Sequence, residues 1–307
     1  MLRNSPPVYL LAILSAIIAT PAQAGVQRAF VASYGLNSNT SFNCDVTHPC
    51  RQFLAAVTVV NPDGEVVALD TAAYGAVTIT QSISITAAPG AYAGITAFPG
   101  ANGVTIASNV DVVLRGLTIN GQGGNNGILM SGNSSLSIEN CVISNFSGGG
   151  QKGVFVNSAA SVRIVDTLVR DNDTGIQLQG GAFTDISGSK FLGNNTAILA
   201  TSSSSPFTSV TISDTIVSAG GTGVEAIASG TGSSRIEMIR TSITTNLKGI
   251  ASSASAGSAS VTFSDSMITG NVIGYFRATN GTLVSPGNNT ITDNGSNAGP
   301  LNPLTLL

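Results

Sequence analysis

The stretch VRIVDTLVRDNDTGI, from Val162 to Ile176, carries a pattern that recurs along the chain. Apolar residues occupy its first, third and eighth positions, and a Gly stands directly before the last apolar residue. The same arrangement begins at Val210, Ile236 and Val261, and each time the Gly lies thirteen residues after the first apolar residue. A repeat of this kind, made of strand-forming residues, is typical of a solenoid of stacked coils.

The glycine, or an Ala in its place, marks the length of each coil. Successive positions are 22 to 26 residues apart, and longer intervals contain insertions such as 147–151 and 202–207. We therefore predict an all-β, single-stranded parallel β-helix of about ten coils, each with three short strands. The glycine is expected either because the turn has positive φ or because two backbone segments approach closely there. The column consists of Gly103, Gly127, Gly153, Gly175, Ala197, Gly223, Gly249 and Gly274.

Within each coil, the alternation of a strand decides which side chains form the core. Val162, Ile164 and Val169 are expected to point inward, and Arg163 and Val165 outward.

Residues 1–24 have the features of a secretory signal peptide. Arg3 is followed by the apolar run LLAILSAIIA and by the cleavage pattern Ala22-Gln23-Ala24. We expect a secreted, periplasmic or cell-envelope protein with a mature net charge of −4. No later apolar run is long enough to span a bilayer, and the absence of basic clusters argues against nucleic-acid binding.

The remaining chain divides into three predicted parts. Residues 25–62 form an N-terminal cap, 63–297 the β-helix and 298–307 a C-terminal tail. The cap is predicted to contain a short helix from Pro49, with an apolar stripe that ends at Val60. Such a helix would cover the open end of the first coil.

The cysteines indicate one covalent link and no metal centre. Cys44 and Cys50 are six residues apart, which in an exported protein suggests a local disulfide. Together with His48 they would offer only three metal ligands, whereas structural zinc requires four. Cys141 stands where other coils have Thr167, Thr215 and Thr241, and we expect it to be a small stacked residue.

One turn column is rich in Asn and Asp. Gly188 and Arg240 interrupt it, and a ladder of side chains bonded to the turn backbone is expected. A calcium site is the alternative, although the carboxylates are mostly separated by other residues. The column contains Asn140, Asp166, Asp214 and Asp265.

The coils, the N-terminal segments FVASYGLNSNT, PCRQF, GEVVALD and YGAVTITQSISI, and the closing NNTITDN resemble those of a known family. The chain resembles the secreted bacterial right-handed parallel β-helix repeat proteins of the pectate-lyase-like superfamily. The resemblance covers nearly all of the mature chain and implies a right-handed helix. It leaves the function open, because the superfamily contains lyases, hydrolases, tailspikes, adhesins and proteins with no known activity.

The outward column of the first strand holds the charged candidates Arg163, Asp185 and Glu237. Pectate lyases use an acidic calcium cluster with an Arg base, and these residues are the nearest equivalent that the resemblance implies. The alternative is a cross-strand ion pair between Arg163 and Asp185 on a solvated sheet. The polygalacturonase motifs are absent as a set, and His48 is the only His.

A second outward column, on the strand after the glycine, is apolar at several places. Phe155 and Leu199 could form a sugar-stacking or protein-contact patch, or an inserted loop or the tail could cover them.

These observations favour an exported, monomeric, non-catalytic scaffold that binds a polysaccharide or a cell-surface protein along one strand face. The first alternative is a polysaccharide lyase or hydrolase that acts on an acidic polysaccharide, with calcium as the one cofactor considered. The second alternative is an adhesin or a self-assembling structural protein.

Overall fold

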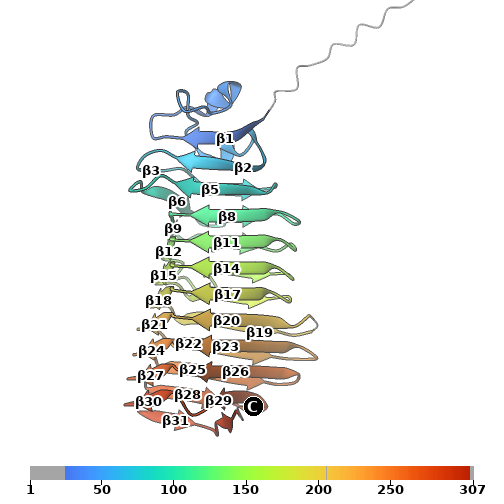
Figure 1. Ribbon diagram of the computed structural model, residues 1–307, viewed down its shortest axis with the longest axis vertical. Helices are drawn as coiled ribbons and strands as arrows, with labels where there is room; N and C mark the ends of the chain where they lie inside the picture. Colours follow the sequence, from blue (N-terminus) through green and yellow to red (C-terminus); the bar gives the residue numbers. More distant parts are fainter. Residues whose placement is uncertain (1–24, 205, 305–307) are drawn as a thin grey trace, which may run out of the picture.

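The computed structural model describes residues 25–204 and 206–304, and the predicted signal peptide lies outside these residues. The chain winds through three parallel sheets, here called A, B and C, and from β2 to β31 each coil adds one strand to each sheet (Figure 1). The predicted parallel β-helix is therefore confirmed. No helix of the described residues has the length and apolar character needed to cross a membrane.

Sheet A has twelve strands and forms the broadest face in Figure 1. Its strands are β1 (Val26–Val31), β2 (Val60–Ala68), β5 (Ile83–Ala87), β8 (Asp111–Arg115), β11 (Ser135–Glu139), β14 (Ser161–Val165), β17 (Phe183–Ser187), β20 (Thr208–Ser213), β23 (Ser233–Ile239), β26 (Ser258–Ser264), β29 (Gly281–Ser285) and β32 (Asn302–Pro303).

Sheet B has ten shorter strands, which follow those of sheet A in each coil. They are β3 (Ala72–Ala73), β6 (Ala93–Ala97), β9 (Leu117–Gly121), β12 (Val142–Ser144), β15 (Leu168–Arg170), β18 (Lys190–Leu192), β21 (Ile216–Ser218), β24 (Ser242–Thr244), β27 (Met267–Thr269) and β30 (Thr290–Thr292).

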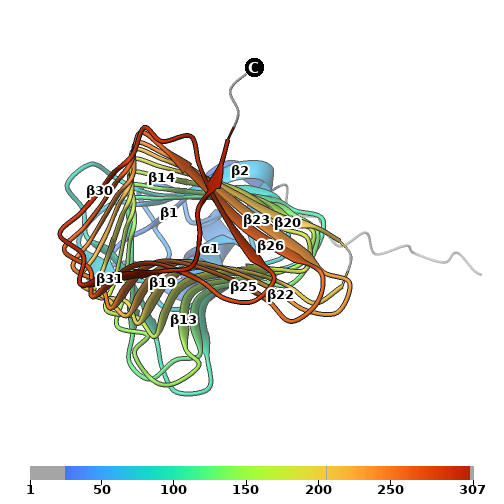
Figure 2. The same ribbon diagram turned by 90° about the horizontal axis from the view of Figure 1, so that it is seen from below.

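Sheet C has ten strands and completes each coil. They are β4 (Val77–Ile79), β7 (Asn102–Ile106), β10 (Asn126–Met130), β13 (Lys152–Asn157), β16 (Thr174–Gln179), β19 (Thr196–Ser202), β22 (Thr222–Ala228), β25 (Lys248–Ala254), β28 (Ile273–Arg277) and β31 (Ser296–Ala298). Seen along the axis, sheets A and C converge at one corner, and sheet B closes the opposite side (Figure 2).

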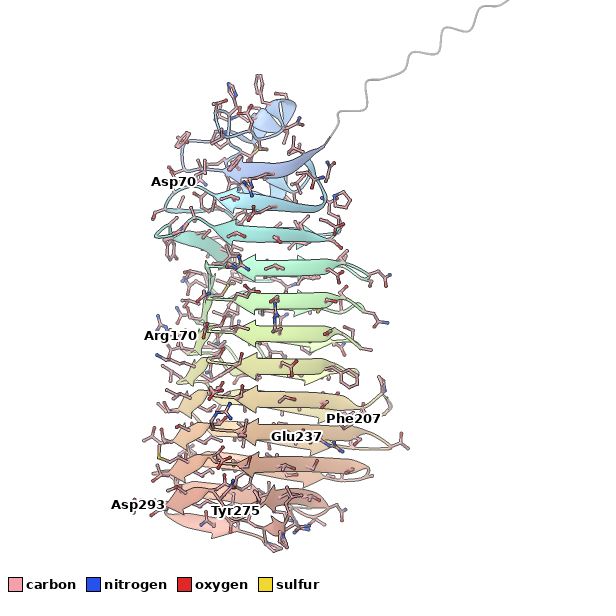
Figure 3. All side chains as sticks on the ribbon, in the orientation of Figure 1. Asp70, Arg170, Phe207, Glu237, Tyr275 and Asp293 are labelled. Carbon is pink, nitrogen blue, oxygen red and sulfur yellow. A yellow bond between two sulfur atoms is a disulfide. The ribbon has the colours of Figure 1, made fainter. Side chains whose placement is uncertain are left out.

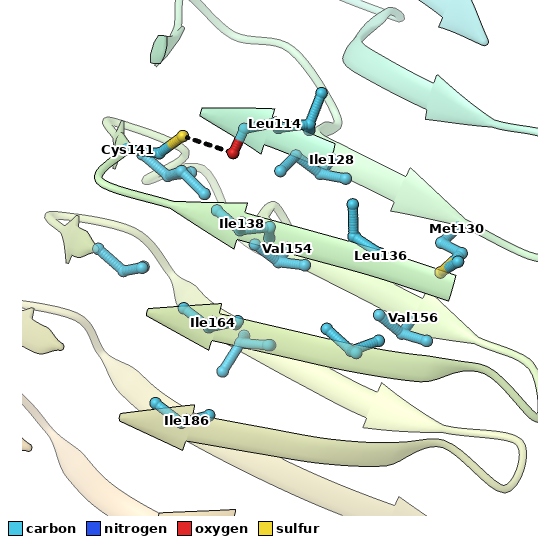
Figure 4. Packing of buried hydrophobic residues seen from close by; sticks show 14 of the residues in the cluster. Leu114, Ile128, Met130, Leu136, Ile138, Cys141, Val154, Val156, Ile164 and Ile186 are labelled. Carbon is cyan, nitrogen blue, oxygen red and sulfur yellow. Dashed lines mark hydrogen bonds between the residues drawn. The ribbon is translucent and has the colours of Figure 1, made fainter. Parts of the chain in front are cut away.

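The core consists of columns of aliphatic side chains that stack from coil to coil. Leu114, Ile138, Ile164 and Ile186 occupy paired positions on β8, β11, β14 and β17, and all four are fully or almost fully buried (Figure 4). Val162 and Val169 are also buried, and Arg163 is exposed, as the alternation predicts. Each aliphatic side chain removed from water in this way contributes about 1.5–3 kcal/mol before the cost of ordering the chain.

The repeated glycine is needed for close approach. A Cβ added to Gly127 would lie 2.5 Å from the carbonyl oxygen of Gly153, the equivalent residue of the next coil. The same contact would be 2.6 Å between Gly153 and Gly175. Positive φ was the alternative reason, and it is found at other positions.

The Asn/Asp turn column occupies the corner between sheets A and B, where the backbone has positive φ. Asp166 has φ 50°, Gly188 φ 60° and Arg240 φ 48°. Asn and Asp tolerate this conformation better than most residues, so the column is selected by backbone geometry. Asp214 binds the Arg240 side chain, and Asp265 accepts from Asn288. The predicted side-chain-to-backbone ladder was therefore placed in the wrong column.

The hydroxyl ladder lies one residue further along the same corner. Thr167 Oγ1 donates to the Val165 carbonyl at 2.9 Å and accepts the Cys141 N–H at 3.3 Å. Cys141 lies in this ladder and is 2 % exposed, so the expectation of a small stacked residue agrees with the structure. The ladder contains Cys141, Thr167, Ser189, Thr215, Thr241 and Ser266.

An amide ladder, which the sequence analysis missed, fills the corner between sheets B and C. Asn172 Oδ1 accepts the Phe146 N–H at 3.0 Å, and its Nδ2 donates to Asn194 Oδ1 at 2.9 Å. The ladder is interrupted at Gly220 and resumes at Asn246. Its members are Asn172, Asn194, Asn246, Asn271 and Asn294.

The N-terminal cap contains less helix than predicted. The α-helix α1 spans only Phe53–Ala56, and a 3-10 helix, η1, spans Asn37–Phe42. The predicted helix was too long because residues 57–59 form a turn and Val60 begins β2, which pairs with β1. β1 adds a strand of sheet A within the predicted cap, and Cys44 and Cys50 form a disulfide beside it. At the other end, β32 of the predicted tail pairs with β29.

Candidate functional site

A groove of about 470 Å³ runs along the outer face of sheet A, across the strands from β2 to β17. Small hydroxyl side chains from successive coils form much of its floor: Ser84, Ser135, Ser137 and Ser161. Parallel pairing places Ser135 beside Ser161, and Ser137 beside Arg163. Because strands of one sheet are about 4.8 Å apart, the groove offers hydrogen-bonding groups at regular intervals along the axis.

Arg163 lies in the groove but is bound to a carboxylate that the sequence analysis did not single out. Its Nη2 is 3.2 Å from Glu139 Oε1, and Arg115 Nη2 is 2.7 Å from Glu139 Oε2. Ser137 Oγ also donates to Glu139 at 2.8 Å. The hydrogen bond from Ser137, together with those from Arg115 and the two positive charges, lowers the pKa of Glu139 although burial opposes the shift.

The predicted ion pair between Arg163 and Asp185 is therefore wrong. The two residues are register partners on β14 and β17, as expected. Glu139 is the stronger partner because its side chain is only 15 % exposed and Ser137 and Arg115 already hold its carboxylate in one position. Arg163 also donates to Ser137 Oγ, which turns it toward β11.

Three carboxylates in the groove have no ion-pair partner among the described residues. These are Asp63, Asp111 and Asp185. Asp63 and Asp111 follow the same column, with β5 between their strands, so their backbones are about 10 Å apart. Because these three carboxylates outnumber Arg163, the one basic residue of the lining, the groove is negative overall.

Glu237, the third charged candidate, shares this face but not the groove. It lies on β23, three strands beyond Arg163 along the sheet (Figure 3). Its carboxylate is 3.5 Å from Arg235. Arg163, Asp185 and Glu237 therefore do not form one catalytic cluster.

The residues of the described chain do not fit the calcium cluster that the resemblance implies. Calcium requires six to eight converging oxygens. No group of three or more His, Cys, Asp or Glu side chains within residues 25–204 and 206–304 is placed to hold a metal ion.

The apolar candidates lie on sheet C, away from the groove. Phe155 and Leu199 are both half-buried and flank Gln177 in the outward column. Lys152 Nζ lies 4.8 Å from the centre of the Phe155 ring and covers part of it. Loops from the green part of the chain project beside β13 in Figure 2, but both side chains keep some exposure.

Comparison with known proteins agrees with this architecture. A family model described as a right-handed β-helix region matches residues 78–237, slightly more than half of the chain. The protein therefore belongs to the right-handed β-helix family. A search of curated proteins gives no match.

Among solved structures, the chain is similar to the crystal structure of pectate lyase Pel9A, with a TM-score of 0.60. The identity is 16 %, and the alignment covers 89 % of this chain and 78 % of that one. At this identity the likeness is one of fold and does not define the function.

Proposed function

We propose that the protein is an exported, non-catalytic scaffold that binds a glycan along the outer face of sheet A. The observation that carries this proposal is the groove itself, with serine hydroxyls and carboxylates from successive coils at regular spacing. These groups can donate to and accept from sugar hydroxyls. A linear groove parallel to the axis suits an extended chain better than a compact ligand.

The charges favour a neutral or amine-bearing glycan over a polyuronate. Asp63, Asp111 and Asp185 would repel a polyanion, and Arg163 is already bound to Glu139. The same arrangement weakens the lyase alternative, because an Arg held between Glu139 and Ser137 is poorly placed to act as a free base.

A steric block tests the location. Ser161→Trp would fill the groove, whereas Ser260→Trp introduces the same side chain in the same outward column on β26, outside it. On an array of neutral, amine-bearing and uronate glycans, we expect binding to the first two classes. Ser161→Trp should lower the affinity at least tenfold, and Ser260→Trp should leave it unchanged.

Three results would overturn the proposal. They are retention of uronates alone, equal binding by both tryptophan variants, and release of unsaturated products or reducing ends from polyuronides with or without calcium. Light scattering on the same samples tests the expected monomer against the self-assembling alternative.

A further inference from the structure

A second pocket, of about 340 Å³, opens on the outer face of sheet C, close to the corner that leads back to sheet A. Its lining includes the side chains of Asn157, Gln179 and Thr201 and the apolar groups of Ile227 and Pro206. None of the lining residues carries a charge. This composition contrasts with the acidic groove on sheet A.

The polar groups of the pocket are held in place before any ligand arrives. Gln177 Nε2 donates to Gln179 Oε1 at 2.7 Å, and Gln179 Nε2 donates to Asn157 Oδ1 at 2.8 Å. Thr201 Oγ1 also donates to Gln179 Oε1, at 3.3 Å. Gln179 is therefore fixed from three sides, which reduces the entropy lost on binding.

Part of the hydrogen-bonding capacity remains unused. The Asn157 amide nitrogen and the Gln177 amide oxygen have no partner among the described residues. Asn157 is exposed, and Gln177 and Thr201 are half-buried, so a ligand can reach these groups from solvent. Asn157 therefore offers a donor within the pocket lining, and Gln177, which is bonded to Gln179 just outside that lining, offers an acceptor.

Apolar surface lies directly beside these amides. Ile227 is the register partner of Thr201, and Leu199 stands two residues before Thr201 on the same face. Phe155 stands in the equivalent place before Asn157. A face that combines oriented amides with aliphatic and aromatic carbon matches a sugar ring, which presents hydroxyls at its edge and C–H groups on its faces.

We propose that this pocket binds one uncharged sugar unit of a glycan, independently of the groove on sheet A. The sugar hydroxyls would bond to Asn157 and Gln177, whose positions Gln179 fixes, and the C–H face would pack on Ile227. The volume lies at the lower end of the range of about 300–1,000 Å³ that is typical of small-molecule sites, which suits a single unit.

The test uses calorimetric titration with the uncharged sugars cellotetraose, xylotetraose, maltotetraose and tetra-N-acetylchitotetraose. The full chain with Ser161→Trp serves as the background, so that the sheet A groove is blocked. We expect one remaining site for at least one of these sugars. Adding Gln179→Ala should weaken it about tenfold, the effect of losing roughly one hydrogen bond and its ordering.

The matched control is Asn126→Ala. Asn126 donates to Asn102 in a similar amide pair on sheet C but does not line the pocket. Asn126→Ala should leave sugar binding unchanged. Gln179→Glu keeps the size of the side chain and serves as a second variant in case Gln179→Ala does not fold. The proposal is overturned if the Ser161→Trp protein binds none of these sugars. It is also overturned if neither Gln179 variant changes the affinity of the Ser161→Trp protein. If Ser161→Trp itself has no effect but Gln179→Ala abolishes binding, the sheet C site stands and the sheet A proposal fails.

Discussion

The two corners that flank sheet B have the same backbone conformation but different side-chain hydrogen bonds. Each begins with a residue of positive φ, such as Asp166 or Asp171, and continues with a buried polar residue. At the corner between sheets A and B this residue is Thr167, whose hydroxyl makes two hydrogen bonds. At the corner between sheets B and C it is Asn172, whose amide bonds to both neighbouring coils. The amide corner is therefore expected to hold adjacent coils together more strongly.

The largest effect is expected at the amide corner. Asn172→Ala removes the acceptor of the Phe146 N–H and a link to Asn194, which leaves buried groups without partners. We expect a loss of about 3 kcal/mol in the free energy of unfolding, measured by urea denaturation. Asn195→Ala, in the equivalent turn of the next coil but exposed, should cost less than about 0.5 kcal/mol. Equal losses of unfolding free energy for the two variants would contradict a stabilising role of the amide ladder.

The thiol in the hydroxyl corner predicts sensitivity to alkaline pH. Burial raises the pKa of Cys141 to about 11, whereas an unfolded thiol ionises near 9. The unfolded state therefore releases its proton first, so this group's contribution is present below pH 9 and is lost as the pH rises toward 11. The loss should approach about 3 kcal/mol.

Cys141→Ser provides the control for that pH profile. Serine is the residue of the ladder at Ser189 and does not ionise in this range. Burial also raises the pKa of Tyr74, but this group titrates in both proteins and cancels in the difference. Parallel stability profiles for the two proteins between pH 8 and 11 would contradict the buried-thiol account.

A smaller loss is expected from the hydroxyl corner itself. Thr167→Val keeps the shape of the side chain but removes the acceptor of the Cys141 N–H and the donor to Val165. The free energy of unfolding should fall by about 1–2 kcal/mol. Thr211→Val, on the exposed face of β20, is the matched control and should change it little. If Thr167→Val lowered the free energy of unfolding as much as Asn172→Ala, the two corners would not differ in strength as expected.

The smallest change should have the opposite sign. Thr184 is 4 % exposed, and its hydroxyl is buried without a partner in the described chain. It stands between Val162 and Val210 in a column that is otherwise apolar. Thr184→Val should therefore stabilise the protein by about 1 kcal/mol in the same denaturation experiment. Destabilisation would indicate that the hydroxyl is paired in solution.

The sequence predicts the structure of each coil but not which side chains pair between neighbouring coils. Alternation alone places Ile164 inside and Arg163 outside, because a strand has only two faces. It cannot decide whether Arg163 binds Asp185 directly opposite or Glu139 on the other side, since both are one strand away. That choice depends on Ser137 and Arg115, which prepare the carboxylate of Glu139.

The N-terminal helix and the amide ladder could not be predicted fully from the sequence. The segment that ends at Val60 fits an apolar helical stripe and a β-branched strand equally well, but residues 57–59 form a turn and only Val60 pairs with β1. The amide ladder was hidden among other turn residues. Its one sequence signal is that Asn172, Asn246 and Asn271 each stand three residues before the repeated glycine.

The direction of the backbone hydrogen bonds has a mechanical consequence. Every strand bonds only to the coils before and after it, so the bonds of all three sheets lie along the long axis of the molecule. A force applied between the two ends of the molecule therefore acts on every coil in series. Extension of a single molecule should therefore release it coil by coil, in steps of 22 to 26 residues between Gly103 and Gly274. A rod built in this way would act as a graded tether, whose length increases under load.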